Sequence, residues 1–365
     1  MEQYLEYSPI VFAVEEEYQI TLRVASPCVC AVEVGKERYY DDANGVLRTD
    51  CAVHRVTVPM AVLDEAKAYT VILSGCPERR SYYTKLEPEE RTVFSFCPLP
   101  KEGARLFFLS DTHGWYEPVV RAAKAGGEYD AILFGGDIAN DSGSDEAREL
   151  MFRLSDILTH GTLPVLAVRG NHDTRGVLAE TISTYYPLAE GRTYYPVTLG
   201  SLRILVLDCG EDKLDSCSEY GGVNCFEQFR RTETRWLRAF AERESAEGGA
   251  ARYRMAVCHM PFTHRHDEPG EEIFNIENEL YDEWTMLLDR SIRPQLLLSG
   301  HEHVHSVQAG DRGAENFLTV VGAARGSEAY PDRDYFSGTR LILENGKIRA
   351  DFCDSEGSVT PVGTA

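Results

Sequence analysis

The chain has 365 residues, more than the roughly 250–300 at which a single hydrophobic core usually stops growing, so two domains are expected. Its 43% hydrophobic and 26% charged residues are typical of a globular protein, and no stretch approaches the ~18 apolar residues that span a bilayer. With 37 Lys and Arg against 59 Asp and Glu, the formal charge of −22 repels polyanions and provides no basic surface for nucleic acid.

The first residues and the cysteines predict the cellular compartment. The segment 1–9 begins with an acidic residue and has no apolar stretch, so it does not resemble a secretory signal. The ten cysteines are scattered without a Cys-x-x-Cys pair, and Cys28 and Cys30 are too close together for a typical zinc knuckle. We therefore expect a cytoplasmic protein whose cysteines are free, partly buried thiols.

Residues 1–97 have the pattern of short β-strands. Apolar residues at every second position predict half-buried strands at Tyr18–Val24 and again at Tyr69–Leu73. Asn44-Gly45 is a hairpin turn signal, and no helical period of useful length appears. We predict an N-terminal β-sandwich of the immunoglobulin or fibronectin type over residues 1–99, with the boundary in the segment Cys97–Gly103.

Residues 100–365 alternate between continuous apolar runs and helix-like segments. Runs without polar alternation are typical of strands covered on both faces, and they occur at Leu106–Leu109, Ala131–Phe134, Val165–Val168, Ile204–Leu207, Met255–Val257 and Leu296–Leu298. Helices are predicted at about 117–125, 145–159, 177–185, 227–246 and 274–289. A C-terminal hairpin is predicted at 340–352, with an Asn-Gly turn. Such alternation indicates a layered α/β domain.

Side chains that commonly bind metals follow five of these apolar runs. They are Asp111 and His113, Asp137, Asn171, His259, and His301 with His303. The carboxyl ends of parallel strands form the ligand crevice of such sheets, so these side chains are expected to meet. Each has an ordinary alternative: a helix cap for Asp111, a turn for Asn171, or a buried core histidine for His259. Five coincidences in chain order favour one site.

This ordered set resembles the calcineurin-like metallophosphoesterase family: Asp-x-His, Gly-Asp, Gly-Asn-His-Asp, His and Gly-His-x-His, over about residues 104–350. The resemblance implies a four-layer α/β/β/α sandwich with two divalent transition-metal ions. Asp111, His113 and His303 would bind the first ion, and Asn171, His259 and His301 the second, with Asp137 bridging both. Such ligands, without thiolate, suit manganese, iron, zinc or cobalt, and a bridging carboxylate suits ions about 3.5–4 Å apart.

The same resemblance implies a mechanism. The expected activity is hydrolysis of a small phosphomonoester or phosphodiester by direct attack of a metal-bound hydroxide, with no phospho-enzyme. His172 corresponds to the family's general acid, since an imidazole has a pKa suited to proton transfer near neutrality. Asp173 would either orient and charge-stabilise His172 or cap the following helix.

One subfamily has a different metal ligand. Purple acid phosphatases also carry a sandwich before this domain, and they place a tyrosine ligand for ferric iron three residues after the Gly-Asp aspartate. Here that position is Asn140, and the first motif carries His113. We therefore expect neither a tyrosinate-to-iron colour nor a dedicated mixed-valence site, and the sandwich is expected to be similar in fold only.

Three features near the motifs have weaker signals. Thr263–His266 could present positive charge to a phosphate or form a solvated loop. Residues 208–236 could be a substrate flap with Tyr220 as a stacking residue, or a packed excursion, and the cysteines there, Cys217 and Cys225, are expected to be simply buried. His305 extends the alternation of His301 and His303 but is expected to be structural.

The expected partners follow from charge and motif content. The acidic charge favours a small phosphate ester over nucleic acid, since bound metals dominate the potential only locally. We expect no membrane partner, and the N-terminal domain is a candidate for homo-oligomer contacts. Two alternatives stay open: a nuclease, which needs a basic groove, and a metal-free interaction scaffold of the same fold, in which the ligand set would be broken.

Overall fold

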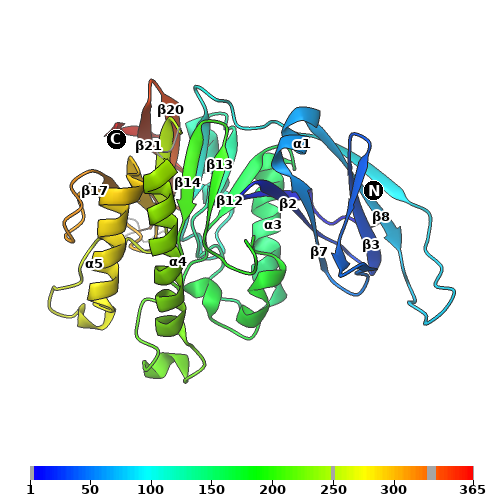
Figure 1. Cartoon of the computed structure of the whole chain (residues 1–365), viewed down its shortest axis with the longest axis horizontal. Helices are drawn as coiled ribbons and strands as arrows, with labels where there is room; N and C mark the ends of the chain where they lie inside the picture. Colours follow the sequence, from blue (N-terminus) through cyan, green and yellow to red (C-terminus); the bar gives the residue numbers. More distant parts are fainter. Residues whose placement is uncertain (1–3, 248–250, 327–333, 365) are drawn as a thin grey trace.

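Two large β-sheets pack face to face, with helices on their outer faces, in the computed structural model, which describes residues 4–247, 251–326 and 334–364 (Figure 1). One sheet has the order β22 (Val359–Thr364), β21 (Lys347–Asp354), β20 (Phe336–Glu344), β10 (Arg105–Leu109), β11 (Ala131–Phe134), β12 (Pro164–Ala167), β1 (Ile10–Val14), β2 (Glu17–Arg23) and β7 (Val53–Pro59), with β19 (Ala324–Arg325) on β20. The other has the order β13 (Tyr195–Leu199), β14 (Leu202–Val206), β15 (Tyr253–Val257), β16 (Leu296–Ser299), β18 (Leu318–Val321) and β17 (Ser306–Gln308).

Helices cover both outer faces and complete a four-layer α/β/β/α sandwich, as predicted. α2 (Glu117–Gly126) and α3 (Asp145–Thr159) contact strands of the first sheet. α4 (Phe226–Glu247) and α5 (Asn278–Leu287) cover the second sheet, and a π-helical turn at Leu288–Ile292 follows α5. The predicted helix at 177–185 is a 3-10 helix, Ala179–Thr184. No helix in the described ranges combines the length and apolar character needed to cross a bilayer.

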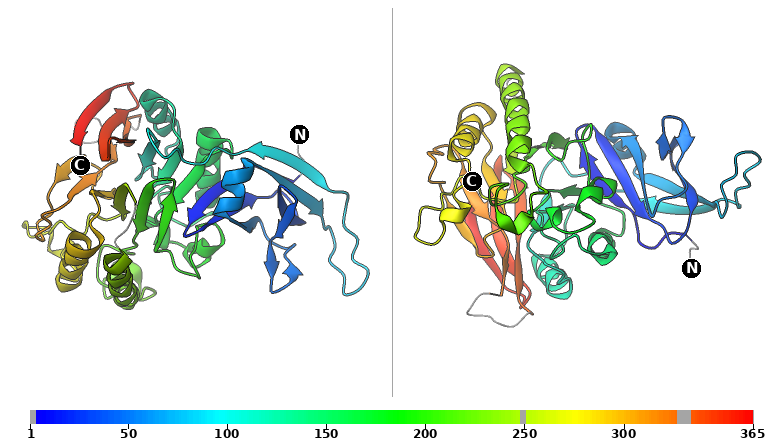
Figure 2. Two further views of the ribbon diagram at one scale, coloured as in Figure 1. Left: turned by 45° about the horizontal axis from the view of Figure 1, so that its top comes forward. Right: turned by 90° about the horizontal axis from the view of Figure 1, so that it is seen from below.

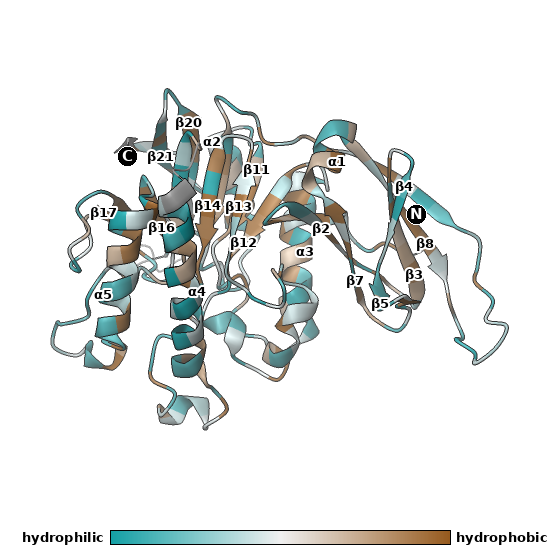
Figure 3. Ribbon diagram, in the orientation of Figure 1, coloured by the Kyte–Doolittle hydropathy of each residue, from teal (hydrophilic) through white to brown (hydrophobic). Residues whose placement is uncertain are grey.

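Strands of the second sheet are buried on both faces, which explains their continuous apolar runs. Ile204 and Val206 of β14 belong to the core between the sheets, whereas Leu205 between them belongs to the core under α4 and α5. β16 repeats the pattern. Each fully buried side chain of this kind contributes about 1.5–3 kcal/mol. The hydropathy colouring agrees, with brown strands between partly teal helices (Figure 3).

The N-terminal region is a β-sandwich, and one of its sheets continues the large sheet of the following region. β1 pairs in parallel with β12, with Val11 opposite Pro164 and Phe12 opposite Val165. β1, β2 and β7 pack on a four-stranded sheet, β4 (Glu37–Tyr40), β3 (Cys28–Val34), β8 (Ala68–Gly75) and β9 (Glu90–Ser95). One apolar core extends through both regions. The division at residue 99 therefore stays a prediction, since strand pairing and core cross it.

Two smaller features complete the N-terminal region. The Asn-Gly signal corresponds to a hairpin of β5 (Asp42–Ala43) and β6 (Val46–Leu47), in which Asn44 and Gly45 have φ of 52° and 87°, as a type I′ turn requires. The sequence pattern did not indicate α1 (Met60–Ala66), which is only 7 residues long. The N-terminal sheets lie at one end of the molecule and β20–β22 at the other (Figure 2).

Candidate metal centre

The seven predicted metal-ligand side chains lie together at the carboxyl ends of five strands. β10, β11 and β12 run parallel in the first sheet, and β15 and β16 run parallel in the second. The loops that follow them carry Asp111 with His113, Asp137, Asn171, His259, and His301 with His303. The two sheets therefore contribute to one crevice, as expected for strand ends of this topology.

The first group of ligands consists of Asp111, His113 and His303. Nε2 of His113 lies 3.1 Å from Nε2 of His303, and Oδ1 of Asp111 lies 3.4 Å from the same His303 atom. One candidate ligand atom from each residue falls within 4.8 Å of the others. Converging imidazole nitrogens and a carboxylate oxygen are a suitable set for one transition-metal ion.

The second group consists of Asn171, His259 and His301. The amide oxygen of Asn171 lies 3.1 Å from Nε2 of His259 and 3.2 Å from Nδ1 of His301. Oδ2 of Asp137 lies 3.3 Å from Nε2 of His259 and 3.9 Å from Nε2 of His113. Asp137 therefore stands between the two groups, where a bridging carboxylate is needed.

Hydrogen bonds to the backbone aim these side chains at the crevice. Nδ1 of His259 lies 2.7 Å from the carbonyl oxygen of Gly135, so this nitrogen donates and Nε2 is the ring nitrogen that faces the site. The backbone N–H of His301 donates to Oδ2 of Asp111, and that of His172 donates to Oδ1 of Asp137. Oδ1 of Asp111 is buried without a hydrogen-bond partner. An orphaned buried carboxylate oxygen among imidazoles fits a cation site.

Strained backbone surrounds the ligands. Asp111, His113, Asp137, His301 and His303 all have φ between 44° and 73°, a left-handed conformation that costs non-glycine residues energy and clusters at functional sites. Close backbone approach adds to this constraint. A Cβ on Gly170 would lie 2.1 Å from Oδ1 of Asp137, and one on Gly136 would lie 2.5 Å from the nitrogen of Gly170. The glycines of the motifs therefore keep two ligand loops in contact.

The pKa shifts favour neutral imidazoles at His113 and His301 and ionised carboxylates at Asp111 and Asp137. Burial lowers the pKa of His113 to about 3 and that of His301 to about 4, so both rings are neutral near pH 7. Burial alone would raise the pKa of Asp111 and Asp137, but His259 and the other neighbouring histidines together outweigh it and hold both below the usual value. The two carboxylates in turn raise the pKa of His259 to about 10 against the effect of its burial. The crevice thus favours positive charge.

The calcineurin-like phosphoesterase family model matches residues 104–305, which is more than half of the chain and contains all seven ligands. The chain belongs to the calcineurin-like phosphoesterase family.

A solved structure supports the fold, and two others show a weaker likeness. The purple acid phosphatase PPD1 from yellow lupin (Lupinus luteus) seeds has a TM-score of 0.64 at 13% identity, over 99% of this chain and 74% of that one. TT1561 of Thermus thermophilus has a TM-score of 0.40 at 16% identity (68% and 98% covered), and Vacuolar Protein Sorting 29 from Cryptosporidium parvum has 0.35 at 15% (72% and 97%). No curated protein matches the chain significantly.

Asp173 contacts the loops of the phosphoesterase motifs. Its Oδ2 accepts hydrogen bonds from the backbone N–H groups of Gly170 and Asp137 and from the hydroxyl of Tyr186. Burial and the charge of Asp137 raise the pKa of Asp173 to about 6. Nδ1 of His172 is instead 2.6 Å from the carbonyl oxygen of Asn140. The geometry therefore supports a structural role for Asp173, in which it holds the loops of Gly170 and Asp137 together. Its catalytic assignment stays a prediction.

Arg175 is a site residue that the sequence pattern did not indicate. Its Nε and Nη2 donate to the two carboxylate oxygens of Glu211, at 3.0 and 2.8 Å, and its Nη1 lies 3.3 Å from Nε2 of His172. Nη2 also lies 3.3 Å from Oδ1 of Asp212. Arg175 directly follows the 3-10 turn His172–Thr174 that the Gly-Asn-His-Asp motif begins. In the sequence, the only indication of a site role for Arg175 is that it is a charged residue close after the Gly-Asn-His-Asp motif.

Two open pockets lie near this arginine, and only one of them is lined by it. One of about 570 Å³ is lined by four of the ligands and by His172, Asp212 and His264, among others. The other, of about 650 Å³, is lined by Arg175 itself, Val177, Tyr220 and further residues. The first pocket is the space in which a substrate would contact the ligand groups.

The structure decides between several of the weaker predictions. Tyr220 is buried and its hydroxyl donates to Glu211 and Asp212, so the packed alternative is correct for this residue. His305 stacks on Phe352 and lies 2.8 Å from the hydroxyl of Ser337, in agreement with a structural role. All ten cysteines are free, although Cys225 is exposed rather than buried.

The segment Thr263–His266 lines the first pocket, but other groups balance its charges. Nδ1 of His264 lies 2.9 Å from Glu302, and Arg265 forms hydrogen bonds of 2.7 and 2.9 Å with Asp282. Its side chains are thus ordered by acidic partners and are not simply solvated.

Proposed function

We propose that the protein is a metal-dependent phosphoesterase that hydrolyses a small phosphomonoester or phosphodiester at a dinuclear centre. One observation carries the proposal: side chains from five strand ends form two donor groups with Asp137 between them. Asp111, His113 and His303 would hold one ion, and Asn171, His259 and His301 the other, with Asp137 contacting both. Imidazole, carboxylate and amide donors suit manganese, iron or zinc.

The contribution of such a centre to the reaction is electrostatic. When bound, a pair of divalent cations supplies charge neutralisation for the phosphoryl group and lowers the pKa of water toward neutrality. The chain's own part is to hold the imidazoles and the ionised carboxylates in a fixed arrangement, and the backbone hydrogen bonds to Asp111, Asp137 and His259 serve this purpose.

His172 is the proposed proton donor to the leaving oxygen. The carbonyl of Asn140 accepts from its Nδ1, which leaves Nε2 as the atom that can carry the transferable proton. Nε2 faces the guanidinium of Arg175, and the His172 ring packs edge-on to His113 at 4.7 Å between centroids. Proton donor and metal ligand therefore lie side by side.

Arg175 is the proposed phosphate-binding group. The paired bonds to Glu211 occupy Nε and Nη2 and fix the plane of the guanidinium, so Nη1, next to His172, is the group that remains to contact a phosphate oxygen. The adjoining pocket of about 570 Å³ suits a small ester, and its lining includes the carboxylates of Asp212, Glu271, Glu302 and Asp311. An acidic lining disfavours a polyanionic chain, which supports a small substrate over a nucleic acid.

The proposal is tested with metal-stripped protein reloaded separately with manganese, zinc or iron. Turnover of p-nitrophenyl phosphate and bis-p-nitrophenyl phosphate is measured for the wild type and for Asp137→Asn. Metal-dependent turnover that Asp137→Asn loses is expected, and the better ester assigns the monoesterase or diesterase preference. Absence of turnover together with absence of bound metal would favour the scaffold alternative, and cleavage of single-stranded DNA instead would favour the nuclease.

A further inference from the structure

Arg325 lies at the edge of the sheets that carries the metal ligands. β18 runs parallel to β16, so both strands end at the same edge of the second sheet. After β18, the backbone N–H of Gly322 donates to the carbonyl of Ser299, next to the loop of His301. The chain then passes to the first sheet, where Arg325 on β19 pairs with Phe336 on β20. Arg325 therefore follows a strand end in the same way as the predicted ligands do.

The side chain of Arg325 contacts the loop that carries the first ligands. Its guanidinium lies over the ring of Trp115, 5.5 Å from the ring centre, and Trp115 is the second residue after His113. Burial and, to a smaller extent, the charge of Arg325 lower the pKa of His113. Burial also lowers the pKa of Arg325 itself, against the opposing charges of Asp111 and Asp137. The guanidinium is therefore within electrostatic reach of the first ligand group and of the bridging carboxylate.

The guanidinium of Arg325 lacks a protein acceptor within the described residues. Among the half-buried arginines of residues 4–247, 251–326 and 334–364, it is the only one whose side chain forms neither a hydrogen bond nor an ion pair. Half-buried arginines are normally paired, because burial removes part of the hydration of the charge. Next to bound metal ions the guanidinium would meet further positive charge, so an anion in the crevice would stabilise it. A phosphoryl group is such an anion.

We propose that Arg325, stacked on Trp115, binds a terminal oxygen of the substrate's phosphoryl group and makes the centre selective for phosphomonoesters. This role rests on the proposed function and narrows its substrate class. A phosphomonoester carries up to two negative charges on three terminal oxygens, whereas a phosphodiester carries one charge on two such oxygens. Coulomb energy is proportional to the product of the charges, so one guanidinium favours the dianion about twice as strongly as the monoanion.

The test compares two esters in variants of this arginine, with protein loaded with Mn²⁺. The wild type should prefer p-nitrophenyl phosphate over bis-p-nitrophenyl phosphate. Arg325→Met should lower kcat/KM about 100-fold for the monoester, as for the loss of one group that stabilises transition-state charge. For the diester the loss should be about tenfold, so the preference for the monoester should fall about tenfold. Arg325→Lys keeps the charge and should retain most of the preference.

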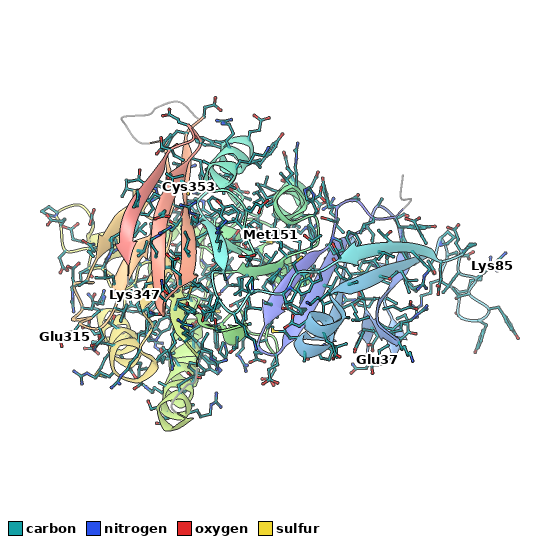
Figure 4. The ribbon with its side chains drawn as sticks, turned by 90° about the horizontal axis from the view of Figure 1, so that it is seen from above. Glu37, Lys85, Met151, Glu315, Lys347 and Cys353 are labelled. Atoms are coloured by element: carbon teal, nitrogen blue, oxygen red, sulfur yellow. The ribbon has the colours of Figure 1, made fainter. Side chains whose placement is uncertain are left out.

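Arg105→Met is the matched control, because it removes the same charge from an exposed arginine of the same sheet. Arg105 lies opposite Ile342 on β20, about 20 Å along the strand from the residue that pairs with Arg325. Lys347, at the turn of the β20–β21 hairpin, and Cys353, toward the other end, mark the two ends of these strands in Figure 4. Arg105 lies toward the Lys347 end. Its variant should keep both activities within about twofold.

Two further measurements do not depend on turnover. Inorganic phosphate should bind to Mn²⁺-loaded Arg325→Met at least about tenfold more weakly than to the wild type, at unchanged metal content, and equally well to Arg105→Met. In the wild type, phosphate should protect Arg325 from the arginine reagent phenylglyoxal, with the labelled peptides identified by mass spectrometry. The exposed Arg105 should react equally with and without phosphate. The labelling covers the case in which the Arg325 variants do not fold.

Several results would overturn the role of Arg325: a wild type that prefers the diester, equal losses for both esters in Arg325→Met, the same losses in Arg105→Met, or labelling of Arg325 that phosphate does not reduce. A wild type that binds manganese but hydrolyses neither ester would instead contradict the proposed function. In that case the labelling still decides whether Arg325 binds phosphate.

Discussion

The pair of Arg175 and Glu211 allows stability and turnover to be separated by substitution. Glu211 is fully buried, and its carboxylate accepts from Arg175 as well as from the hydroxyls of Thr174 and Tyr220. Arg175→Met removes two charge-assisted hydrogen bonds and leaves the carboxylate buried without its cation. Breaking a buried pair in this way costs about 3–5 kcal/mol of the free energy of unfolding.

A second substitution should restore the stability. In Arg175→Met/Glu211→Gln the charge of Glu211 is gone, while the amide can still bond both hydroxyls: its oxygen accepts from one, and its NH₂ group donates to the other. Replacement of a buried ion pair by neutral groups is often close to neutral, so most of the loss should be recovered. Turnover should fall about 100-fold in both variants, because neither has the guanidinium of Arg175 to stabilise the phosphoryl charge.

The test measures urea unfolding and kcat for four proteins: the wild type, both single variants and the double variant. The cycle predicts a coupling between the two positions in stability, and turnover in the double variant that stays as low as in Arg175→Met. Unchanged stability of Arg175→Met would refute the assigned ion pair. Recovery of turnover in the double variant would refute a direct role for Arg175 at the phosphate.

Three further predictions concern other residues. Gly170→Ala adds a Cβ 2.1 Å from Oδ1 of Asp137, so metal content and turnover should fall together, at a cost of about 1–3 kcal/mol in packing, and a variant with full metal content would contradict this. Burial and the charge of Asp208 raise the pKa of Glu233 above 4.5, so the contribution of Glu233 to stability is present below that pH and is lost as the pH rises through the folded pKa. In urea unfolding, the stability of Glu233→Gln relative to the wild type should therefore increase between about pH 5 and about pH 8. A difference that stays constant over this range would contradict the argument. His172→Asn should lower kcat about 10²–10⁴-fold for an alkyl phosphate but much less for p-nitrophenyl phosphate, whose leaving group needs no proton; equal losses would exclude the proton-donor role.

The meeting of these side chains in one crevice could be predicted from the sequence because each of them follows a buried strand. An apolar run such as Leu106–Leu109 defines where the strand ends, and the residue types after it define the chemistry. The order of these runs along the chain then predicts one crevice. The separation of ligands into two groups came from the family resemblance and not from spacing.

Contacts that depend on tertiary structure were not predictable in this way. Arg175 and Glu211 are 36 positions apart, in loops without a regular period, and only the folded chain brings them together. The structural role of Asp173 likewise depends on hydrogen bonds from Tyr186 and from the neighbouring loop of Asp137.

The continuation of the large sheet into the N-terminal region did have a signal in the sequence. Ile10–Val14 is a continuous apolar run and is buried at every position, like β11 and β12, whereas the half-buried pattern at Tyr18–Val24 suggested an independent sandwich. A strand covered on both faces belongs inside a sheet, and β1 lies between β12 and β2. Residue pattern indicates burial, but it does not identify the neighbouring strand.

The dinuclear centre is tested most directly by the number of metal ions that turnover requires. Metal-free protein is titrated with Mn²⁺ while p-nitrophenyl phosphate or bis-p-nitrophenyl phosphate hydrolysis is followed, beside Asp137→Asn. The predicted result is activity that develops up to two equivalents of Mn²⁺, together with an Asp137→Asn variant that binds less metal and does not turn over substrate. Full activity at one equivalent, or unchanged activity and metal content in Asp137→Asn, would contradict two ions sharing that carboxylate.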